Sequence, residues 1–186
     1  RAMLAEVYKT CRGGGQLLCQ APTGIGKTMS VLFGALKALG AGVGGPVFYL
    51  TARGTTRAAA EDALARLRAA APGLPLRSVT LTAKDKICLC ETRECTPEAC
   101  PYANGYYARI KEALAAALDY EGGADCALGA EALTALARRF SVCPFELGLD
   151  LSLWSDVVIG DYNYLFDPTV RLQRFFETKG DYLFLI

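Results

Sequence analysis

The chain has 186 residues, of which 52% are apolar and 21% are charged, and its formal net charge is +1. This composition is typical of one folded domain with a buried core, excludes extensive disorder, and neither favours nor excludes a nucleic-acid partner. The sequence contains no histidine, which excludes Ser-His triads, imidazole bases and every His-containing metal site.

Strands and helices are predicted to alternate along most of the chain. Five short apolar runs predict buried parallel β-strands, at residues 16–20, 46–51, 77–81, 156–161 and 182–186. One helix is predicted from Lys27 to Leu39, where Gly40 ends it, and another from Arg57 to Ala71, where Pro-Gly follows. The β-α-β-α-β order indicates an open α/β sheet.

Residues 85–143 interrupt this alternation and are predicted to form an insertion. A cysteine-rich loop comes first, and two helices joined through residues 121–125 follow as a hairpin. The apolar faces of these helices consist of Ile110, Leu114 and Leu118, and of Leu133, Leu136 and Phe140. Cys143 directly follows the second helix, so the hairpin returns a cysteine toward the cysteine-rich loop.

The stretch APTGIGKT fits the phosphate-binding pattern G-x-x-x-x-G-K-[ST], with alanine in place of the first glycine. It lies between a predicted strand and a predicted helix, which is the context that distinguishes a nucleotide site from a glycine-rich turn. The predicted nucleotide-binding residues are Ala21, Pro22, Thr23, Gly24, Ile25, Gly26, Lys27 and Thr28. Backbone N–H groups from Gly24 onward would hold phosphates, while Lys27 would reach the β- and γ-phosphates of ATP and Thr28 would bind Mg²⁺.

Eight cysteines occur in the chain, and residues 87–100, ICLCETRECTPEAC, contain four of them. The N-terminus has no signal-peptide features and no run reaches about 18 apolar residues, so we expect a cytoplasmic, reducing location without a membrane partner, nucleoid-associated if the source is bacterial. Zinc ribbons use C-x₂-C pairs, which the chain lacks, whereas iron–sulfur clusters accept wider spacing if four thiolates converge. The candidate ligands are Cys88, Cys95, Cys100 and Cys143.

The other cysteines are assigned differently. Residues two apart in an extended segment point to opposite sides, so only one of Cys88 and Cys90 is expected to face a cluster. Cys11, Cys19 and Cys126 are expected to be small buried hydrophobes, Cys19 in the middle of a strand.

These motifs together resemble motor domain 1 of the XPD/DinG group of superfamily 2 DNA helicases, which carry a 4Fe–4S cluster. The resemblance runs along essentially the whole chain. It rests on APTGIGKT, on FYLTARGTTRAAAEDAL after the second predicted strand, on LTAKDKICLC, on CPYANGY, and on CPFELGLDLSLWSDVVIGDYNYLFDP. By position it makes Cys88, Cys95, Cys100 and Cys143 the cluster ligands; Cys90 is an extra thiol.

The resemblance implies a P-loop (RecA-like), mostly parallel sheet with an inserted cysteine-rich helical domain. It implies residues 1–84 as the first part of the motor domain, residues 85–145 as the Fe–S insertion and residues 146–186 as the return to the motor domain. The implied activity is 5′→3′ DNA unwinding driven by ATP hydrolysis, with ATP, Mg²⁺ and a 4Fe–4S cluster as cofactors, single-stranded and forked DNA as partners, and DNA repair as the setting.

Single-stranded DNA is expected to bind after the second predicted strand. The expected contacts are Thr51, Arg53, Thr55 and Thr56, because open α/β sheets bind ligands at the carboxyl ends of their strands. Arg66 and Arg68 are expected to lie on a solvated helix face. The tyrosines near the cysteines either stack on bases or pack the hairpin, and the sequence favours neither; they are Tyr102, Tyr106 and Tyr107.

The start and end of the chain suggest a piece of a longer protein. Residue 1 is arginine rather than methionine, and residues 181–186, DYLFLI, read as the strand after which the family continues with Asp-Glu-Ala-His. We therefore expect these residues alone to bind nucleotide without hydrolysing it. Two alternatives remain: a P-loop kinase or signalling ATPase with a structural zinc lobe, and a non-catalytic, redox-responsive binding module.

Overall fold

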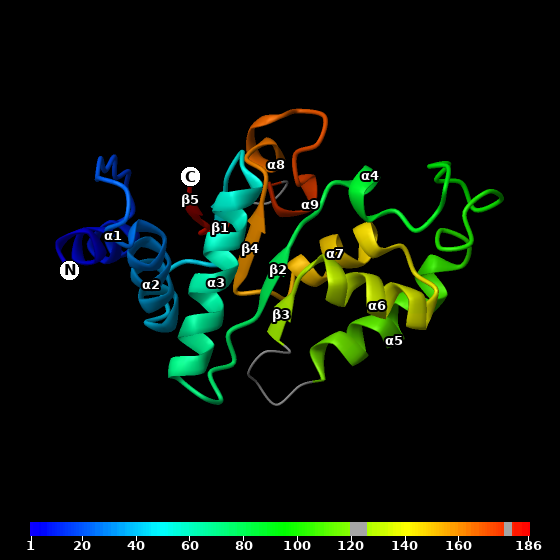
Figure 1. The fold of residues 1–186 in the computed structure, drawn as a ribbon, viewed down its shortest axis with the longest axis horizontal. Coiled ribbons are helices and arrows are strands. Elements are labelled where there is room, and N and C mark those ends of the chain that lie inside the picture. The colour runs from blue at the N-terminus through cyan, green and yellow to red at the C-terminus, as the bar shows by residue number, and fades with distance from the viewer. Residues whose placement is uncertain (120–125, 177–179) are drawn as a thin grey trace. The chain divides into compact units, whose positions relative to one another are not determined.

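The computed structural model describes residues 1–119, 126–176 and 180–186 of the chain. They form two compact units, each with its own core: unit 1 comprises residues 1–71 and 156–186, and unit 2 comprises residues 72–155 (Figure 1). Throughout the described ranges, the helices are too short or too polar to span a membrane.

Unit 1 is built on three parallel strands. Its elements are α1 (Ala2–Gly13), α2 (Lys27–Gly40), β1 (Val47–Leu50), α3 (Gly54–Ala70), β4 (Val157–Gly160), α8 (Asn163–Phe166), α9 (Gln173–Phe176) and β5 (Leu183–Leu185). The central strand β1 pairs in parallel with β4, with Val47 opposite Val157, and with β5, with Val47 opposite Leu183. All residues of β1 and β4 are buried, as continuous apolar runs predict for parallel strands. The strands predicted at residues 46–51, 156–161 and 182–186 are therefore confirmed.

Aromatic side chains fill the core beside β1. The ring of Phe48 lies 5.1 Å from that of Phe175 and 5.6 Å from that of Tyr182, both edge to face, and stacks on Phe184 at 5.4 Å. Edge-to-face and offset stacked pairs at such distances are favourable beyond the area they bury. They fix α9 and β5 against the central strand.

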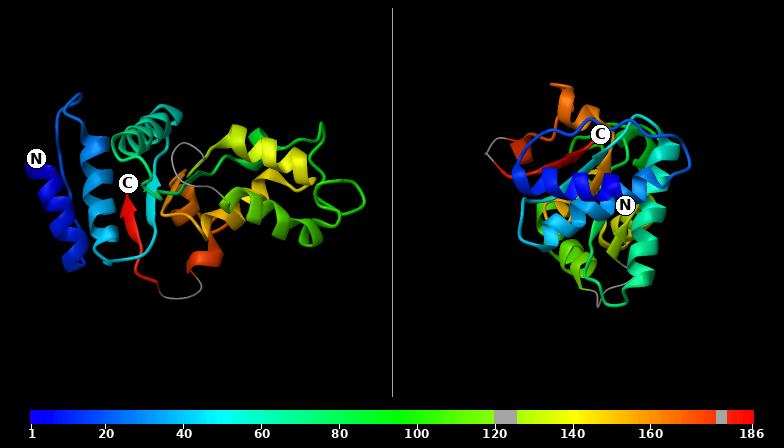
Figure 2. Two further views of the ribbon diagram at one scale, coloured as in Figure 1. Left: turned by 90° about the horizontal axis from the view of Figure 1, so that it is seen from below. Right: turned by 90° about the vertical axis from the view of Figure 1, so that its left-hand side faces the viewer.

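The strand predicted at residues 16–20 is absent, and this prediction was wrong. Residues 14–22 form an irregular segment between α1 and the next turn, and the side chain of Leu18 is 99% exposed. Apolar residues form a strand only where another strand pairs with their backbone, and β1 pairs with β4 and β5 instead. Helix α1, not predicted, packs along α2 (Figure 2), where a Cβ on Gly34 would lie 2.9 Å from Val7.

Unit 2 combines a short parallel pair of strands with helices. Its elements are β2 (Ser78–Thr80), α4 (Lys84–Ile87), α5 (Tyr106–Leu118), β3 (Ala127–Leu128), α6 (Ala130–Phe140) and α7 (Pro144–Ser152). The strand predicted at residues 77–81 is confirmed by β2, and the two predicted helices by α5 and α6, with Ile110 and Leu133 buried. The predicted joint at residues 121–125 lies outside the described residues.

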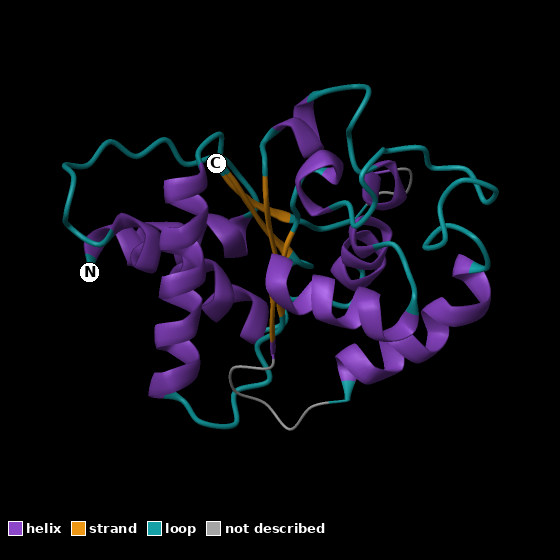
Figure 3. Ribbon diagram, turned by 45° about the vertical axis from the view of Figure 1, so that its right-hand side comes forward, coloured by secondary structure: helices purple, strands orange, loops and turns teal. Residues whose placement is uncertain are grey.

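A long irregular segment separates α4 from α5. Residues 88–105 contain four of the cysteines and form loops and turns, drawn in teal in Figure 3. Backbone hydrogen bonds form single turns within them, such as Cys100 N–H to the carbonyl of Thr96 at 2.9 Å and Asn104 N–H to the carbonyl of Cys100 at 3.0 Å. The domain boundaries predicted from the sequence at residues 84–85 and 145–146 stay predictions.

Candidate functional site

The predicted phosphate-binding loop lies at the N-terminus of α2. Gly24 and Gly26 adopt left-handed conformations, with φ of 82° and 79°, and Gly26 is the N-cap of the helix. A Cβ at either glycine would meet nothing within 4 Å, so conformation rather than space requires glycine there. The first N–H groups of the 14-residue helix α2 lack intrahelical partners and carry its positive dipole end. A helix N-terminus of this kind favours anions, but the strand expected before the loop is absent, so the structure supplies the loop and helix of the predicted strand–loop–helix context without its strand.

Lys27 folds back over the same loop. Its Nζ donates hydrogen bonds to the carbonyl oxygens of Ala21 and Pro22, each at 2.8 Å. Thr28 follows in the first turn of α2, and its side chain is half-buried. The structure thus brings the predicted nucleotide-binding residues together in one continuous loop, with the ammonium group at its centre.

A second polar cluster lies where β1 ends. The N–H of Thr51 donates to the carbonyl of Gly160 at 3.0 Å, which continues the pairing of β1 with β4 by one residue. Arg53 is the N-cap of α3 and is exposed. Thr55 and Thr56 lie in the first turn of α3 rather than in a loop. The four residues predicted to contact DNA are therefore adjacent, at the start of a 17-residue helix whose N-terminus favours anions.

An ion pair joins the first turn of α3 to the residue that follows β4. Arg57 Nη2 lies 3.2 Å from Asp161 Oδ2, with 23% and 29% of the two side chains exposed, and Asp161 Oδ1 accepts the N–H of Asn163 at 3.0 Å. The pair connects α3 to the segment entering α8 and so fixes the backbone beside Arg53. No sequence signal separated Arg57 from the other arginines, because its partner lies 104 residues away.

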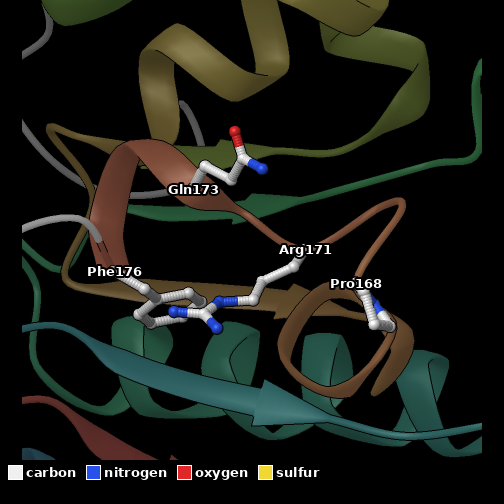
Figure 4. Close-up of a pocket in the computed structure, with 4 residues that line it drawn as sticks. All are labelled: Pro168, Arg171, Gln173 and Phe176. Carbon is white, nitrogen blue, oxygen red and sulfur yellow. The ribbon is translucent and has the colours of Figure 1, made fainter.

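One hollow in unit 1 does not coincide with these sites. Its volume is about 340 Å³, and its lining residues are Pro168, Arg171, Gln173 and Phe176 (Figure 4). The guanidinium of Arg171 lies over the ring of Phe176, 5.4 Å from its centroid. This cation–π contact explains the position of the Arg171 guanidinium without a bound ligand.

Five of the six cysteines of unit 2 fall into two neighbourhoods. Cys90 Sγ lies 3.8 Å from Cys100 Sγ, and Cys88 is close enough to interact with Cys90 as well. Burial of the Cys90 thiol and its contact with Cys100 raise its pKa to about 11. The Cys100 side chain is buried, at 8% exposed. The extra thiol is therefore in contact with a predicted ligand, which the argument from alternating side-chain directions did not anticipate.

The second neighbourhood surrounds Lys84. Its Nζ lies 3.2 Å from Glu146 Oε1 and 5.0 Å from the ring centroid of Phe145, and the thiols of Cys95 and Cys143 are within its electrostatic reach. Cys143 is the N-cap of α7, where burial raises the pKa of its thiol and the N–H groups of Glu146 and Phe145 partly oppose that rise. Proline after a capping residue signals a helix start, so Cys143-Pro144 could have predicted α7.

The side chains available in unit 2 are of the type that binds an iron–sulfur cluster, but in the described part of the chain their positions do not form a metal site. Unit 2 contains six thiols and the chain contains no histidine, which is the donor set expected for iron–sulfur chemistry. Among residues 1–119, 126–176 and 180–186, however, no three cysteine, aspartate or glutamate side chains are arranged to hold a metal ion. The predicted ligands therefore belong to the right chemical class and the same unit, and their convergence on one cluster stays a prediction.

Several predictions about single residues have clear outcomes. Cys126 is fully buried, as predicted, and Cys11 is half-buried, but Cys19 is exposed because the strand predicted around it does not form. Arg66 is exposed, as predicted. Arg68 is 5% exposed, so its assignment to a solvated face was wrong: it continues, at i+4 spacing, the buried stripe that contains Leu64.

The tyrosines separate into different roles. Tyr106 is buried and its hydroxyl donates to Asp150 Oδ2 at 2.7 Å, so it packs the helices of unit 2. Tyr107, the next residue, is 88% exposed. Tyr102 is half-buried. Of the three, Tyr107 is the best placed for stacking on a base.

Comparison with known proteins agrees with this architecture. A family model described as DEAD_2 matches residues 63–181, which is more than half of the chain. The chain belongs to the DEAD_2 family of XPD-like helicases. A solved structure titled "Truncated XPD" matches with a TM-score of 0.62 at 20% identity, covering 97% of this chain and 50% of that one. No curated protein sequence matches.

Membership of DEAD_2 and the likeness to the XPD structure agree on the fold. The α/β architecture with parallel strands is consistent with a RecA-like motor domain, as predicted. The chain spans about half the length of the XPD structure that it matches. The chain therefore belongs to a helicase family, and the activity of the whole protein is proposed below.

Proposed function

We propose that this chain is part of an ATP-driven DNA helicase that moves 5′→3′ along single-stranded DNA. The observation that carries the proposal is the loop at residues 21–28, seated at the N-terminus of α2 in a unit with parallel strands. Membership of DEAD_2 supports it, because that family consists of XPD-like helicases. The polarity rests on the resemblance to the XPD/DinG group.

Nucleotide binding would use the loop and its lysine. The N–H groups at the start of α2 would bind the phosphates of ATP, and Lys27 would exchange the carbonyls of Ala21 and Pro22 for the β- and γ-phosphates. Thr28 would bind Mg²⁺ through its hydroxyl. Each of these groups stabilises negative charge on the transferred phosphoryl group.

DNA binding would use the cluster at the end of β1. Arg53 would bind a backbone phosphate, and the hydroxyls of Thr51, Thr55 and Thr56 would bind neighbouring phosphate oxygens. The Arg57–Asp161 ion pair would keep this segment fixed while DNA moves past it. Because these contacts are to the phosphate backbone of DNA, we expect binding that does not depend on base sequence.

The insertion would carry a 4Fe–4S cluster. Cys88, Cys95, Cys100 and Cys143 would hold it, and when bound it would supply a rigid cross-link between the cysteine loop and the start of α7. The remaining work of unit 2 belongs to its own residues, of which Tyr107 is exposed for contact with a base.

Unwinding by the full-length protein tests the proposal. Wild-type protein should unwind a forked duplex that offers a 5′ single-stranded tail and should hydrolyse ATP in response to single-stranded DNA, whereas Lys27→Ala should do neither. Residues 1–186 alone should bind nucleotide without hydrolysing it, because the family places its Mg²⁺-binding acid after the strand at 182–186. Unwinding of the 3′-tailed fork alone would contradict the polarity.

Metal analysis separates the proposal from its alternatives. Iron and acid-labile sulfide in equal amounts support the helicase, while zinc would favour a P-loop kinase or signalling ATPase with a zinc lobe. DNA binding that needs neither Lys27 nor ATP, with no unwinding, would favour a redox-responsive binding module.

A further inference from the structure

One arginine connects the segments that carry two of the predicted ligands. Arg109, in the first turns of α5, donates to the carbonyl of Ser141 from Nε at 3.0 Å and from Nη2 at 2.7 Å. The same Nη2 donates to the carbonyl of Pro101 at 3.1 Å and to the carbonyl of Asn104. Pro101 directly follows Cys100, and Ser141 lies two residues before Cys143.

The backbone on both sides is shaped around this guanidinium. Ser141 has φ of 54°, and within the described ranges it is the one residue other than glycine with positive φ. It ends α6 in the left-handed conformation, and the next residue, Val142, donates to Ala137 at 3.1 Å. Such a conformation is unfavourable for a residue with a side chain and persists where the surroundings impose it. The two bonds from Arg109 to Ser141 are part of those surroundings.

Gly105 leaves the space that the guanidinium occupies. It is the N-cap of α5 with φ of 65°, and a Cβ added to it would lie 2.8 Å from Arg109 Nη1. Any other residue would therefore displace the arginine as well as strain the backbone. A planar guanidinium can serve three carbonyls at fixed angles, which the single ammonium of a lysine cannot reproduce.

We propose that Arg109 is a positioning residue for the iron–sulfur cluster, holding the segments of Cys100 and Cys143 in register before the metal arrives. This inference rests on the proposed cluster and deepens it. Loops that carry ligands are otherwise free to separate, and partners that orient ligands without touching the metal commonly change metal affinity about 10–100-fold. Arg109 reaches the ligand segments only through backbone carbonyls, so its effect passes through geometry alone.

The test measures metal content in the full-length protein purified without oxygen. Arg109→Ala should lower iron and sulfide per chain, and the rate of cluster reassembly from ferrous iron and sulfide, by about tenfold or more relative to wild type. Arg109→Lys should give iron and sulfide contents and a reassembly rate between those of Arg109→Ala and wild type. Arg138→Ala, which removes an exposed arginine from the last turn of α6, is the matched control and should retain wild-type values.

Each outcome decides the inference. Iron content and reassembly in Arg109→Ala equal to those of Arg138→Ala would overturn it while leaving the proposed cluster intact. If Arg109→Ala does not fold by circular dichroism, Arg109→Lys and Gly105→Ala decide, and folded protein with wild-type iron in both would overturn it. A wild-type protein that binds no iron would overturn the cluster and this inference together.

Discussion

The two units build their candidate sites from different materials. In unit 1 the predicted phosphate loop consists of backbone groups fixed by two left-handed glycines and a helix N-terminus, and a parallel strand leads into the segment predicted to contact DNA. In unit 2 the predicted ligands are side chains on loops and at a helix start, near the Lys84–Glu146 ion pair, the Arg109–Ser141 hydrogen bonds and the Cys90–Cys100 contact. A site made of backbone is formed once the fold is formed, whereas a site made of side chains on loops needs its ligand to complete it.

The largest expected effect is the loss of iron from a variant that disrupts only the site in unit 2. Cys100→Ser should reduce iron and sulfide by at least about tenfold, because three thiolates do not retain the cluster, while ATP affinity in unit 1 stays unchanged. Iron analysis under anaerobic conditions and ATP titration measure the two effects. Cys19→Ser, at an exposed cysteine of unit 1, is the control and should keep its iron.

The same assay decides between the two neighbouring thiols. Cys88→Ser should lose the iron and Cys90→Ser should retain it. The reverse result would make Cys90, which contacts Cys100 at 3.8 Å, the ligand in place of Cys88.

The next largest effect is the loss of ATP affinity in a variant that disrupts only the site in unit 1. Lys27→Ala should weaken ATP binding about 10–100-fold, since it removes charge-assisted hydrogen bonds to phosphate, and should leave iron content unchanged. Isothermal titration with ATP checks the first and metal analysis the second. Lys37→Ala, at an exposed lysine in the last turn of α2, should bind ATP like wild type. Loss of iron in Lys27→Ala would show that the two sites depend on each other.

A smaller effect tests the packing that supports unit 2. Tyr106→Phe removes the hydrogen bond to Asp150 and should lower the free energy of unfolding by about 2 kcal/mol near neutral pH. Trp154, the single tryptophan of the chain, lies in unit 2 and reports its unfolding in urea by fluorescence. Tyr107→Phe, at a residue 88% exposed, should change little.

The effect of Tyr106→Phe should shrink at high pH. Burial, followed by the hydrogen bond to Asp150, raises the pKa of Tyr106 above its ordinary value. Above about pH 10 the unfolded tyrosine ionises while the folded one keeps its proton, so the wild type loses stability with rising pH and the phenylalanine variant escapes that loss. A difference that stays constant between about pH 8 and about pH 11 would contradict this assignment.

The smallest expected effect concerns DNA. Arg53→Ala should weaken binding of single-stranded DNA by the full-length protein several-fold and equally for all sequences, and should reduce the salt dependence by about one unit of slope. Fluorescence anisotropy at several salt concentrations measures both. Arg66→Ala, exposed on the same helix, should keep the wild-type slope. An unchanged slope in Arg53→Ala would remove this arginine from the phosphate contacts.

The features that were predicted correctly are those that local sequence patterns determine. The apolar runs around Phe48 and Val158 form neighbouring parallel strands, and the glycines of residues 21–28 adopt the conformations that the motif requires. These features depend on periodicity and on backbone chemistry, which a single sequence displays directly.

The failures involve contacts between distant segments. The run at residues 16–20 has the composition of a strand but no partner strand, so it stays irregular and leaves Cys19 exposed. Arg68 is buried, and Arg109 binds Ser141 from 32 residues away, and neither could be distinguished from a surface arginine by its neighbours in sequence. Burial and partner choice for long cationic side chains are tertiary properties.

The hydrogen bonds of Lys27 to Ala21 and Pro22 satisfy the ammonium group within the loop itself. An arriving anion must replace two carbonyl contacts that the ammonium already has, so binding is an exchange rather than an addition. A triphosphate offers acceptors to the lysine and to the helix N–H groups at once, so it can replace both carbonyl contacts. If the loop binds nucleotide as proposed, this exchange favours polyphosphates over small anions.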